Sequence, residues 1–162
     1  MKIPPSFAPR QLQRSSCDEY SPRSLSGLRL RKHADYQRAY AASRKRQSAS
    51  MSWFLALRPS LDPGQPMPAR VGLTAGKVLG PAHERNRIKR RMREALRRHV
   101  DLLPDGCDLI FHPRRSILSV EFAKLEAEIV RILRQANAEA AKLTTNLSPP
   151  RIEKAASVKP AS

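Results

Sequence analysis

The stretch ERNRIKRRMREALRR, residues 84–98, decides how this sequence of 162 residues is organised. Eight of the fourteen residues from Arg85 to Arg98 are Lys or Arg, and only Glu94 is acidic. At 100° per residue, one arc of about 100° collects Ile88, Met92, Ala95, Leu96 and His99. This apolar stripe predicts a helix that packs on a sheet. The opposite side and its flanks carry Asn86, Arg90, Arg93 and Arg97, then Arg87, Lys89, Arg91 and Arg98.

The positive face of this helix predicts contact with a polyanion. Solvated surface helices usually alternate charges, because like charges at helical spacing destabilise by a few tenths of a kcal/mol each. Here Arg90, Arg93 and Arg97 repel one another along one ridge, so a merely solvated helix is the weaker interpretation. Arginine offers phosphate a planar, bidentate fork and can stack on exposed bases, which suits RNA at least as well as duplex DNA. We expect no DNA partner, since a strand and a Gly/Pro linker, not a packed helix, precede the segment.

The charge of the whole chain supports a binding surface. The net charge is +17 and the isoelectric point about 11.2. Residues 28–98 hold 18 Lys or Arg against four acidic residues, whereas residues 99–142 hold six against seven. A concentrated basic region of this kind typically binds nucleic acid.

Cysteine usage and apolar runs predict a cytoplasmic protein with no membrane partner. Cys17 and Cys107 lie far apart and form no disulfide framework. The N-terminus lacks the apolar segment of a secretory signal, and the longest strongly apolar run, Trp53–Leu57, is too short to span a bilayer.

Composition divides the chain into three parts. Residues 1–27 are rich in proline and serine and predict a flexible basic arm, and residues 143–162 predict a flexible C-terminal tail. Residues 28–142 form the one candidate domain.

Within that domain, the pattern predicts a helix over 33–42, strands over 51–58 and 69–76, the basic helix, a strand over 107–114 and a long final helix. Ser119 is the expected N-cap of the final helix, with Glu121 in its first turn. The predicted fold class is an α/β (α+β) sandwich of the order helix, strands, helix, strand, helix, with helices packed on a mixed central sheet.

Two tyrosines suggest a surface for unpaired bases. Tyr36 and Tyr40 lie one helical turn apart, and Phe54 can face them from the neighbouring strand while Trp53 points the other way. Aromatic rings stack on unpaired bases for about 1–3 kcal/mol each without demanding a sequence. Basic side chains expected along the path of the nucleic acid backbone are Arg38, Arg44, Lys45 and Arg46. The alternative, that the tyrosines are core anchors, remains equally open.

The residues of a protein-only catalyst are not evident. The one acidic group that could bind metal is Asp101, Asp105 and Asp108, and a solvated turn explains it better. The histidines and cysteines lack zinc-binding spacing. We therefore expect no catalytic residue, no metal site and no cofactor bound by the protein alone; an autonomous metallonuclease is the disfavoured reading.

Three blocks of the sequence, in order, resemble the protein component of bacterial ribonuclease P. LRLRKHADYQRAYAASRKR (28–46) is similar to that family's first helix and basic turn. RVGLTAGKVLGPAHERNRIKRRMREALR (70–97) resembles its central signature, whose core is Arg85-Asn86-Arg87. CDLIFHPR (107–114) and the helix after it resemble its closing strand and helix. The likeness covers roughly 28–137.

The resemblance implies partners and a reaction. It implies a left-handed βαβ crossover, a catalytic RNA subunit as partner, and precursor tRNA as the substrate, from which the assembled enzyme removes the 5′ leader. Magnesium would act in the holoenzyme through the RNA subunit, and the protein would be an accessory.

The resemblance also implies two sets of contacting residues. Those expected on the catalytic RNA are Arg85, Asn86, Arg87, Lys89, Arg90, Arg93, Arg97 and Lys77. Those expected in a cleft for the leader are Tyr36, Tyr40, Phe54, Arg38, Arg44, Lys45 and Arg46. Where the family usually has two adjacent lysines, this chain has Lys77 and Val78, so one basic position is lost. The alternative function is a structural RNA-binding protein of ribosomal type, which composition alone would fit equally well.

Overall fold

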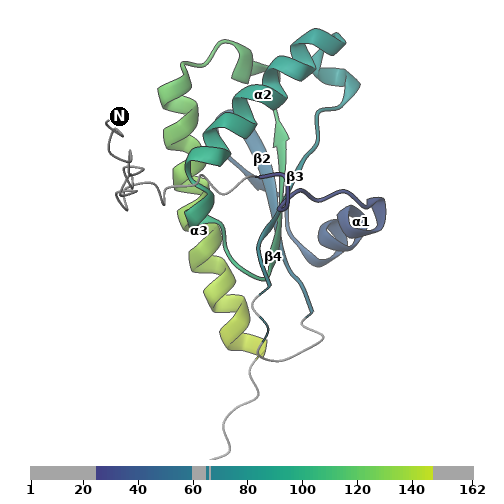
Figure 1. Cartoon of the computed structure of the whole chain (residues 1–162), viewed down its shortest axis with the longest axis vertical. Helices are drawn as coiled ribbons and strands as arrows, with labels where there is room; N and C mark the ends of the chain where they lie inside the picture. Colours follow the sequence, from purple (N-terminus) through teal and green to yellow (C-terminus); the bar gives the residue numbers. More distant parts are fainter. Residues whose placement is uncertain (1–24, 60–64, 66, 148–162) are drawn as a thin grey trace, which may run out of the picture.

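The fold is a four-stranded sheet with helices on both faces, seen in a computed structural model that describes residues 25–59, 65 and 67–147. In Figure 1, α1 lies on one side of the sheet, and α2 and α3 lie on the other. The helices are α1 (His33–Ala42), α2 (Ala82–Arg98) and α3 (Phe122–Leu147). The strands are β1 (Arg46–Gln47), β2 (Met51–Leu57), β3 (Arg70–Leu73) and β4 (Cys107–Pro113). Three short 3-10 helices are η1 (Lys77–Leu79), η2 (Val100–Leu102) and η3 (Arg115–Leu118).

The sheet is mixed, as the sequence predicts. Its strand order is β1-β2-β4-β3, with β2 antiparallel and β3 parallel to the central strand β4. Parallel neighbours need a crossover connection, and here α2 makes it. The left-handed sense that the resemblance implies for this crossover stays a prediction.

Alternation along the strands divides the apolar residues between two clusters. Trp53 belongs to the main core, between the sheet and the helices α2 and α3. Phe54, the next residue, belongs to a smaller cluster under α1 that contains Ala39 and Ile110. Successive side chains of a strand point to opposite faces, so the prediction that Trp53 and Phe54 face apart is confirmed.

The apolar stripe of α2 packs on the sheet as predicted. Ile88, Met92, Ala95 and Leu96 are all fully buried in the main core. The core-facing stripe of the helix therefore carries no charge, and the charged side chains lie on its other faces.

The start of α3 differs from the prediction. The helix begins at Phe122, so the expected N-cap at Ser119 is wrong. The Ser119 hydroxyl donates to the Ser116 carbonyl at 2.9 Å and closes the turn of η3. Glu121 precedes the helix, and its carbonyl accepts the Leu125 amide at 3.1 Å.

The end of α3 lies beyond the boundary expected at residue 142. The helix continues to Leu147, and Thr144 and Thr145 donate their hydroxyls to the carbonyls four residues earlier, each at 2.9 Å. The first residues assigned to a C-terminal tail are thus helical. The remaining residues of both predicted terminal segments, 1–24 and 148–162, lie outside the described residues.

Two further details were not predicted. The polar segment after α1 contains the short edge strand β1, and the strand expected over 69–76 is regular only from Arg70 to Leu73. Within the part of the chain that the structure describes, no helix is both long enough and apolar enough to cross a lipid bilayer.

Candidate RNA-binding surface

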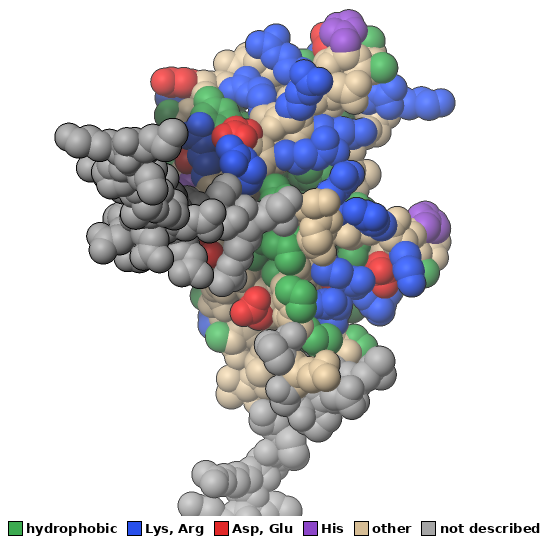
Figure 2. Space-filling model, in the orientation of Figure 1, with side chains coloured by type: hydrophobic (Ala, Val, Ile, Leu, Met, Phe, Trp, Pro, Cys, Tyr) green, Lys and Arg blue, Asp and Glu red, His purple; other side chains and the backbone are tan. Residues whose placement is uncertain are grey.

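The outward face of α2 is a surface of unpaired positive side chains. Figure 2 shows Lys and Arg gathered over this helix in the upper half of the molecule, with a second group around α1 and a hollow in the outline between them. No hydrogen bond or ion pair to another described residue is made by the side chains of Asn86, Arg87, Lys89, Arg90 and Arg93. Arg85 lies beside them with a buried Nε that lacks a partner among the described residues. A row of cations without carboxylates attracts phosphate strongly.

Arg97 differs from the other residues predicted on this face. Its Nη2 atom lies 3.0 Å from Glu94 Oε1, and Arg98 Nε lies 3.2 Å from the same oxygen. Hydrogen bonds from both guanidinium groups lower the pKa of Glu94. The expected repulsion along Arg90, Arg93 and Arg97 is therefore relieved at its last member by an acid of the same helix.

Arg91, on the flank of the helix, stabilises the fold. Its guanidinium donates to the carbonyl of Leu118 at 3.0 Å and to that of Val120. These bonds tie α2 to the segment that precedes α3. The sequence placed Arg91 among the surface cations, and nothing in the helical pattern separates it from its neighbours.

Lys77, the remaining residue predicted to contact the catalytic RNA, lies just before α2. Lys77 is exposed on η1, between Thr74 at the end of β3 and the first turn of α2. Val78 stands where a second lysine was expected, and its side chain is 98 % exposed. Glu84 accepts a hydrogen bond from Arg115 at 3.0 Å, which anchors this first turn to η3.

The three predicted aromatic residues come together under α1. The rings of Tyr40 and Phe54 meet edge to face with centroids 4.9 Å apart, and the Tyr36 and Tyr40 centroids are 6.4 Å apart. All three are half-buried and pack against the small cluster that contains Ile110. They are thus core anchors with exposed edges, so the structure keeps both readings of the tyrosines.

Gly72 explains how Tyr36 reaches the sheet. A Cβ atom at this position would lie 2.7 Å from Tyr36 Cε1, which is closer than a Cβ atom and a ring carbon can pack. The missing side chain lets the ring lie against the backbone of β3, which is one of the uses of glycine inside a strand.

His112 joins this aromatic group and was missed. Its Nε2 lies 2.8 Å from the Tyr40 hydroxyl, and its ring centroid lies 5.3 Å from that of Phe54. Burial, followed by the charge of Lys45, lowers the pKa of His112. The signal was available: His112 shares a face of β4 with Ile110, two residues earlier.

The basic residues predicted beside the aromatic group separate into two sets. Arg44 and Lys45 are exposed just after α1, and Lys45 is close enough to act on His112. Arg46, in contrast, lies on the α3 side of the sheet, where it pairs with Glu139 and stacks over Trp53 at 5.0 Å. Because Arg46 is opposite Trp53 in the β1–β2 register, both side chains share that face, so the prediction that Arg46 lines the cleft is wrong.

Arg38 is also placed away from the aromatic group. It follows Tyr36 by two residues, which is about 200° around the helix. Its Nη2 lies 2.9 Å from Asp108 Oδ2, whereas Tyr40 binds His112, four residues further along the same strand. The role of Arg38 along the same path as the tyrosines stays a prediction.

Asp108 is a buried structural carboxylate. Its side chain has no exposed area, and Arg70 donates to it from Nε and Nη2, each at 2.8 Å. Arg58 Nε lies 3.6 Å from the same group, and Asp35 accepts from Arg70 at 2.9 Å. The expectation of a solvated turn is wrong for this residue, because arginines from β3, α1 and the end of β2 converge on it. The hydrogen bond to Asp108 raises the pKa of Arg70.

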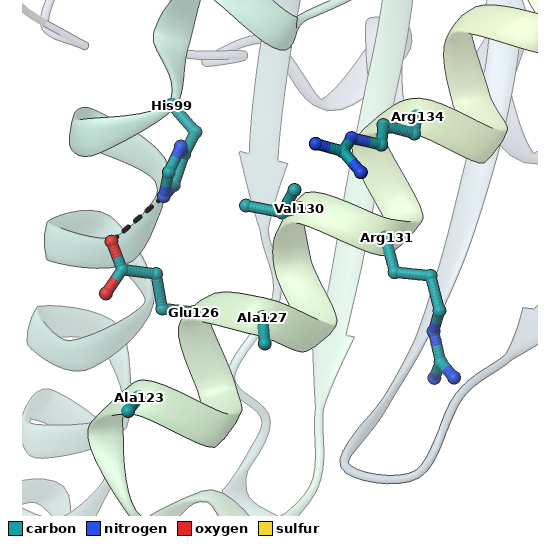
Figure 3. Close-up of a pocket in the computed structure, with 7 residues that line it drawn as sticks. All are labelled: His99, Ala123, Glu126, Ala127, Val130, Arg131 and Arg134. Carbon is teal, nitrogen blue, oxygen red and sulfur yellow. Dashed lines mark hydrogen bonds and ion pairs between the residues drawn. The ribbon is translucent and has the colours of Figure 1, made fainter.

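The described residues contain no cluster of side chains suited to binding a metal ion. No three His, Cys, Asp or Glu side chains in that part of the chain come together to bind a metal ion. The groove on the outer side of α3, shown in Figure 3, contains one hydrogen-bonded pair, His99 and Glu126 at 2.9 Å, beside Ala123, Ala127 and Val130. This pair links α2 to α3, and no second acid or nucleophile lines the groove with it.

Comparison with known proteins points to one family. A family model described as ribonuclease P matches residues 26–137, more than half of the chain. The ribonuclease P protein component of Chloroflexus aggregans is 38 % identical over 109 residues, covering 67 % of this chain and 76 % of the relative. That of Thermobifida fusca is 31 % identical over 116 residues, covering 70 % of this chain and 76 % of the relative.

Solved structures share the fold. The ribonuclease P protein of Thermotoga maritima matches with a TM-score of 0.56 and 23 % identity, covering 66 % of this chain and 96 % of that protein. A mutant ribonuclease P protein of Staphylococcus aureus matches with a TM-score of 0.57 and 24 % identity, covering 68 % and 88 %. These likenesses extend to the mixed sheet and its three helices.

Proposed function

The chain belongs to the ribonuclease P protein family, and on that premise we propose that it binds the catalytic RNA and the 5′ leader of precursor tRNA during tRNA maturation. Its role lies in ribonuclease P, an endoribonuclease complex, as the family match indicates. The assignment of each surface to an RNA is our own.

The outward face of α2 is the proposed contact with the catalytic RNA. Its residues Arg87, Lys89, Arg90 and Arg93 have no carboxylate partner among the described residues, so their charge is available to phosphates. The packing stripe below holds the helix rigidly on the sheet, which keeps the cations in place before binding. Lys77 and the first turn extend this face toward α1.

The aromatic group is the proposed contact with the leader. Tyr36, Tyr40 and Phe54 are each partly exposed, His112 packs against Tyr40 and Phe54, and Lys45 lies near His112. Stacking tolerates any base sequence, which suits a leader that differs from one precursor to another.

The chain itself would not perform the hydrolysis. We assign the cleavage and its magnesium ions to the RNA subunit, in the cytoplasm, with the protein as accessory.

The observation that carries this proposal is the α2 surface, whose cations lack partners among the described residues, beside a half-buried aromatic group, in a chain of this family. The test combines purified protein, its catalytic RNA and precursor tRNA at low magnesium and physiological salt. We expect leader removal to be faster than with RNA alone. An unchanged rate, with RNA still bound, would leave the chain a structural RNA-binding protein of ribosomal type, and cleavage by protein without RNA would make it a metallonuclease.

A further inference from the structure

A small enclosed pocket lies between α2, the outer edge of β3 and the chain that precedes α1. Its floor is aliphatic and includes Leu25, Val71, Leu73 and Leu96. Its cavity of about 60 Å³ has room for roughly four or five water molecules, at 10–15 Å³ each. The pocket touches both surfaces described above, because Tyr36 lines one side and Arg93 another.

Two unpaired arginines stand at the rim. Neither Arg29 nor Arg93 forms an ion pair or a hydrogen bond with another described side chain. The backbone of Arg29 is held in place, since Val71 N donates to Leu28 O at 2.7 Å and Leu30 N donates to Val71 O at 2.9 Å. An apolar hollow between two cations is complementary to a ligand with a flat apolar part and an anionic part.

Tyr36 adds a polar group to the wall. Its hydroxyl donates to the Leu30 carbonyl at 3.3 Å, and its oxygen faces the backbone amide of Leu73. Burial raises the pKa of Tyr36 more than the charge of Arg29 lowers it, and the phenol stays neutral at physiological pH. The wall therefore presents a neutral phenol to a ligand.

We propose that this pocket binds the base of one unpaired pyrimidine nucleotide, with its phosphate between Arg29 and Arg93. The ring edge fills the aliphatic floor, and the sugar stays outside. A cavity of about 60 Å³ admits only the edge of one ring, and the single ring of a pyrimidine enters it more readily than the fused rings of a purine. The inference rests on the proposed function for its source of RNA: a strand on the α2 surface that crosses toward α1 passes over this pocket.

Nuclear magnetic resonance of the full chain tests the ligand chemistry directly, without other RNA. The probe is uridine 5′-monophosphate, and we expect saturable shifts of the Val71 and Leu73 methyl signals. Inorganic phosphate and uridine, which each carry one half of the ligand, should bind more weakly by at least about tenfold, as should adenosine 5′-monophosphate. Equal shifts with phosphate alone would reduce the site to a general anion contact and overturn the proposal.

A double-mutant cycle in the complex with catalytic RNA tests the shared phosphate. If Arg29 and Arg93 hold the same phosphate, the combined Arg29→Ala and Arg93→Ala variant should lose several-fold less affinity than the product of the single losses. The matched control pairs Arg29→Ala with Arg90→Ala, on the same helix but outside the pocket, where the losses should multiply. Multiplying losses in both pairs would overturn the proposal.

The two proposals can fail separately. Should Arg90→Ala leave catalytic-RNA affinity unchanged, the assignment of α2 fails whatever the pocket does. Should Arg90→Ala weaken binding while uridine 5′-monophosphate shifts no pocket signal, the pocket proposal alone fails.

Discussion

The two helices proposed to contact RNA, α2 and α1, use positive charge in opposite ways. On the outward face of α2, Arg87, Arg90 and Arg93 have no partner among the described residues. On α1, Arg38 joins Arg70 of β3 at the buried Asp108, while Tyr36 and Tyr40 pack beside Phe54. The number of arginines in a segment thus predicts neither RNA binding nor stability. The positions of nearby carboxylates decide whether an arginine is free to bind or is paired within the fold.

The largest expected effect comes from removing the buried carboxylate. Asp108→Ala leaves Arg70 and its neighbours without their acceptor, and we expect a loss of about 3 kcal/mol in the free energy of unfolding. Urea denaturation followed by circular dichroism measures it. The exposed Asp105→Ala variant, three residues away, should change stability by less than about 0.5 kcal/mol. Similar losses for both variants would remove the distinction between paired and unpaired arginines.

Substitution with leucine can separate the stacking role of Tyr36 and Tyr40 from their packing role. The Tyr36→Leu and Tyr40→Leu double variant keeps apolar volume but loses stacking, worth about 1–3 kcal/mol per base. We expect the preference of the holoenzyme for precursor over mature tRNA to fall by about 10- to 100-fold. Binding titrations with the two tRNAs measure this preference.

The control for stacking keeps the ring. Tyr40→Phe removes only the hydroxyl that meets His112, and we expect it to retain the preference for precursor tRNA. If the leucine variant also retained it, the tyrosines would be core anchors alone.

One arginine of α2 should change the salt dependence of RNA binding. Arg90→Ala removes one phosphate contact, so we expect affinity for catalytic RNA to fall about tenfold, or about 1.4 kcal/mol. The slope of log affinity against log salt should become shallower by about 0.7–0.9. Filter binding at several salt concentrations gives both numbers.

The adjacent Arg91 is the matched control. It bonds to the carbonyls of Leu118 and Val120, so Arg91→Ala should cost about 1 kcal/mol of stability and leave the salt slope unchanged. A shallower slope for Arg91→Ala would mean that its guanidinium binds phosphate instead.

The smallest expected effect is a pH dependence confined to the α1 side. Burial, and then Lys45, lower the pKa of His112 in the folded state, so the unfolded chain binds a proton more readily. The contribution of His112 is therefore complete above about pH 6.5, its unfolded value, and is lost as the pH falls toward the lower folded pKa. Urea denaturation from pH 7.5 to 5.5 should show a loss of less than about 1 kcal/mol.

The His112→Gln variant should make that part of the profile flat, because glutamine can still meet the Tyr40 hydroxyl. The exposed His83→Gln variant should leave it unchanged. A decline of equal size in both variants would place the titration elsewhere in the molecule.

The elements that the sequence predicts well are those with a strong period. The stripe from Ile88 to Leu96 and the alternation of Trp53 and Phe54 follow from backbone geometry alone. The arginine-rich signature around Arg85, Asn86 and Arg87 then identifies the family. These features depend on neighbours along the chain, so one sequence is enough.

The features that escape prediction depend on contacts between distant segments. Asp108 looks like a turn residue until β3 brings Arg70 beside it, and Arg46 changes face because an unpredicted strand, β1, pairs with β2. Arg91 and Arg93 look alike in the sequence, and only the position of Leu118 separates them. Such pairings are long-range, so no local pattern records them.

Site-specific photo-crosslinking tests the division of labour between α2 and α1 most directly. Burial of the thiol, with Asp108 nearby, raises the pKa of Cys107 to about 11, so it stays unreactive at pH 8. In a Cys17→Ser background, Lys45→Cys or Arg90→Cys can then carry a single photoreactive label in the assembled holoenzyme with precursor tRNA. The account predicts that the label at position 45 crosslinks to the leader and the label at position 90 to the catalytic RNA. Crosslinks from position 90 to the leader, or from position 45 to the catalytic RNA alone, would contradict it.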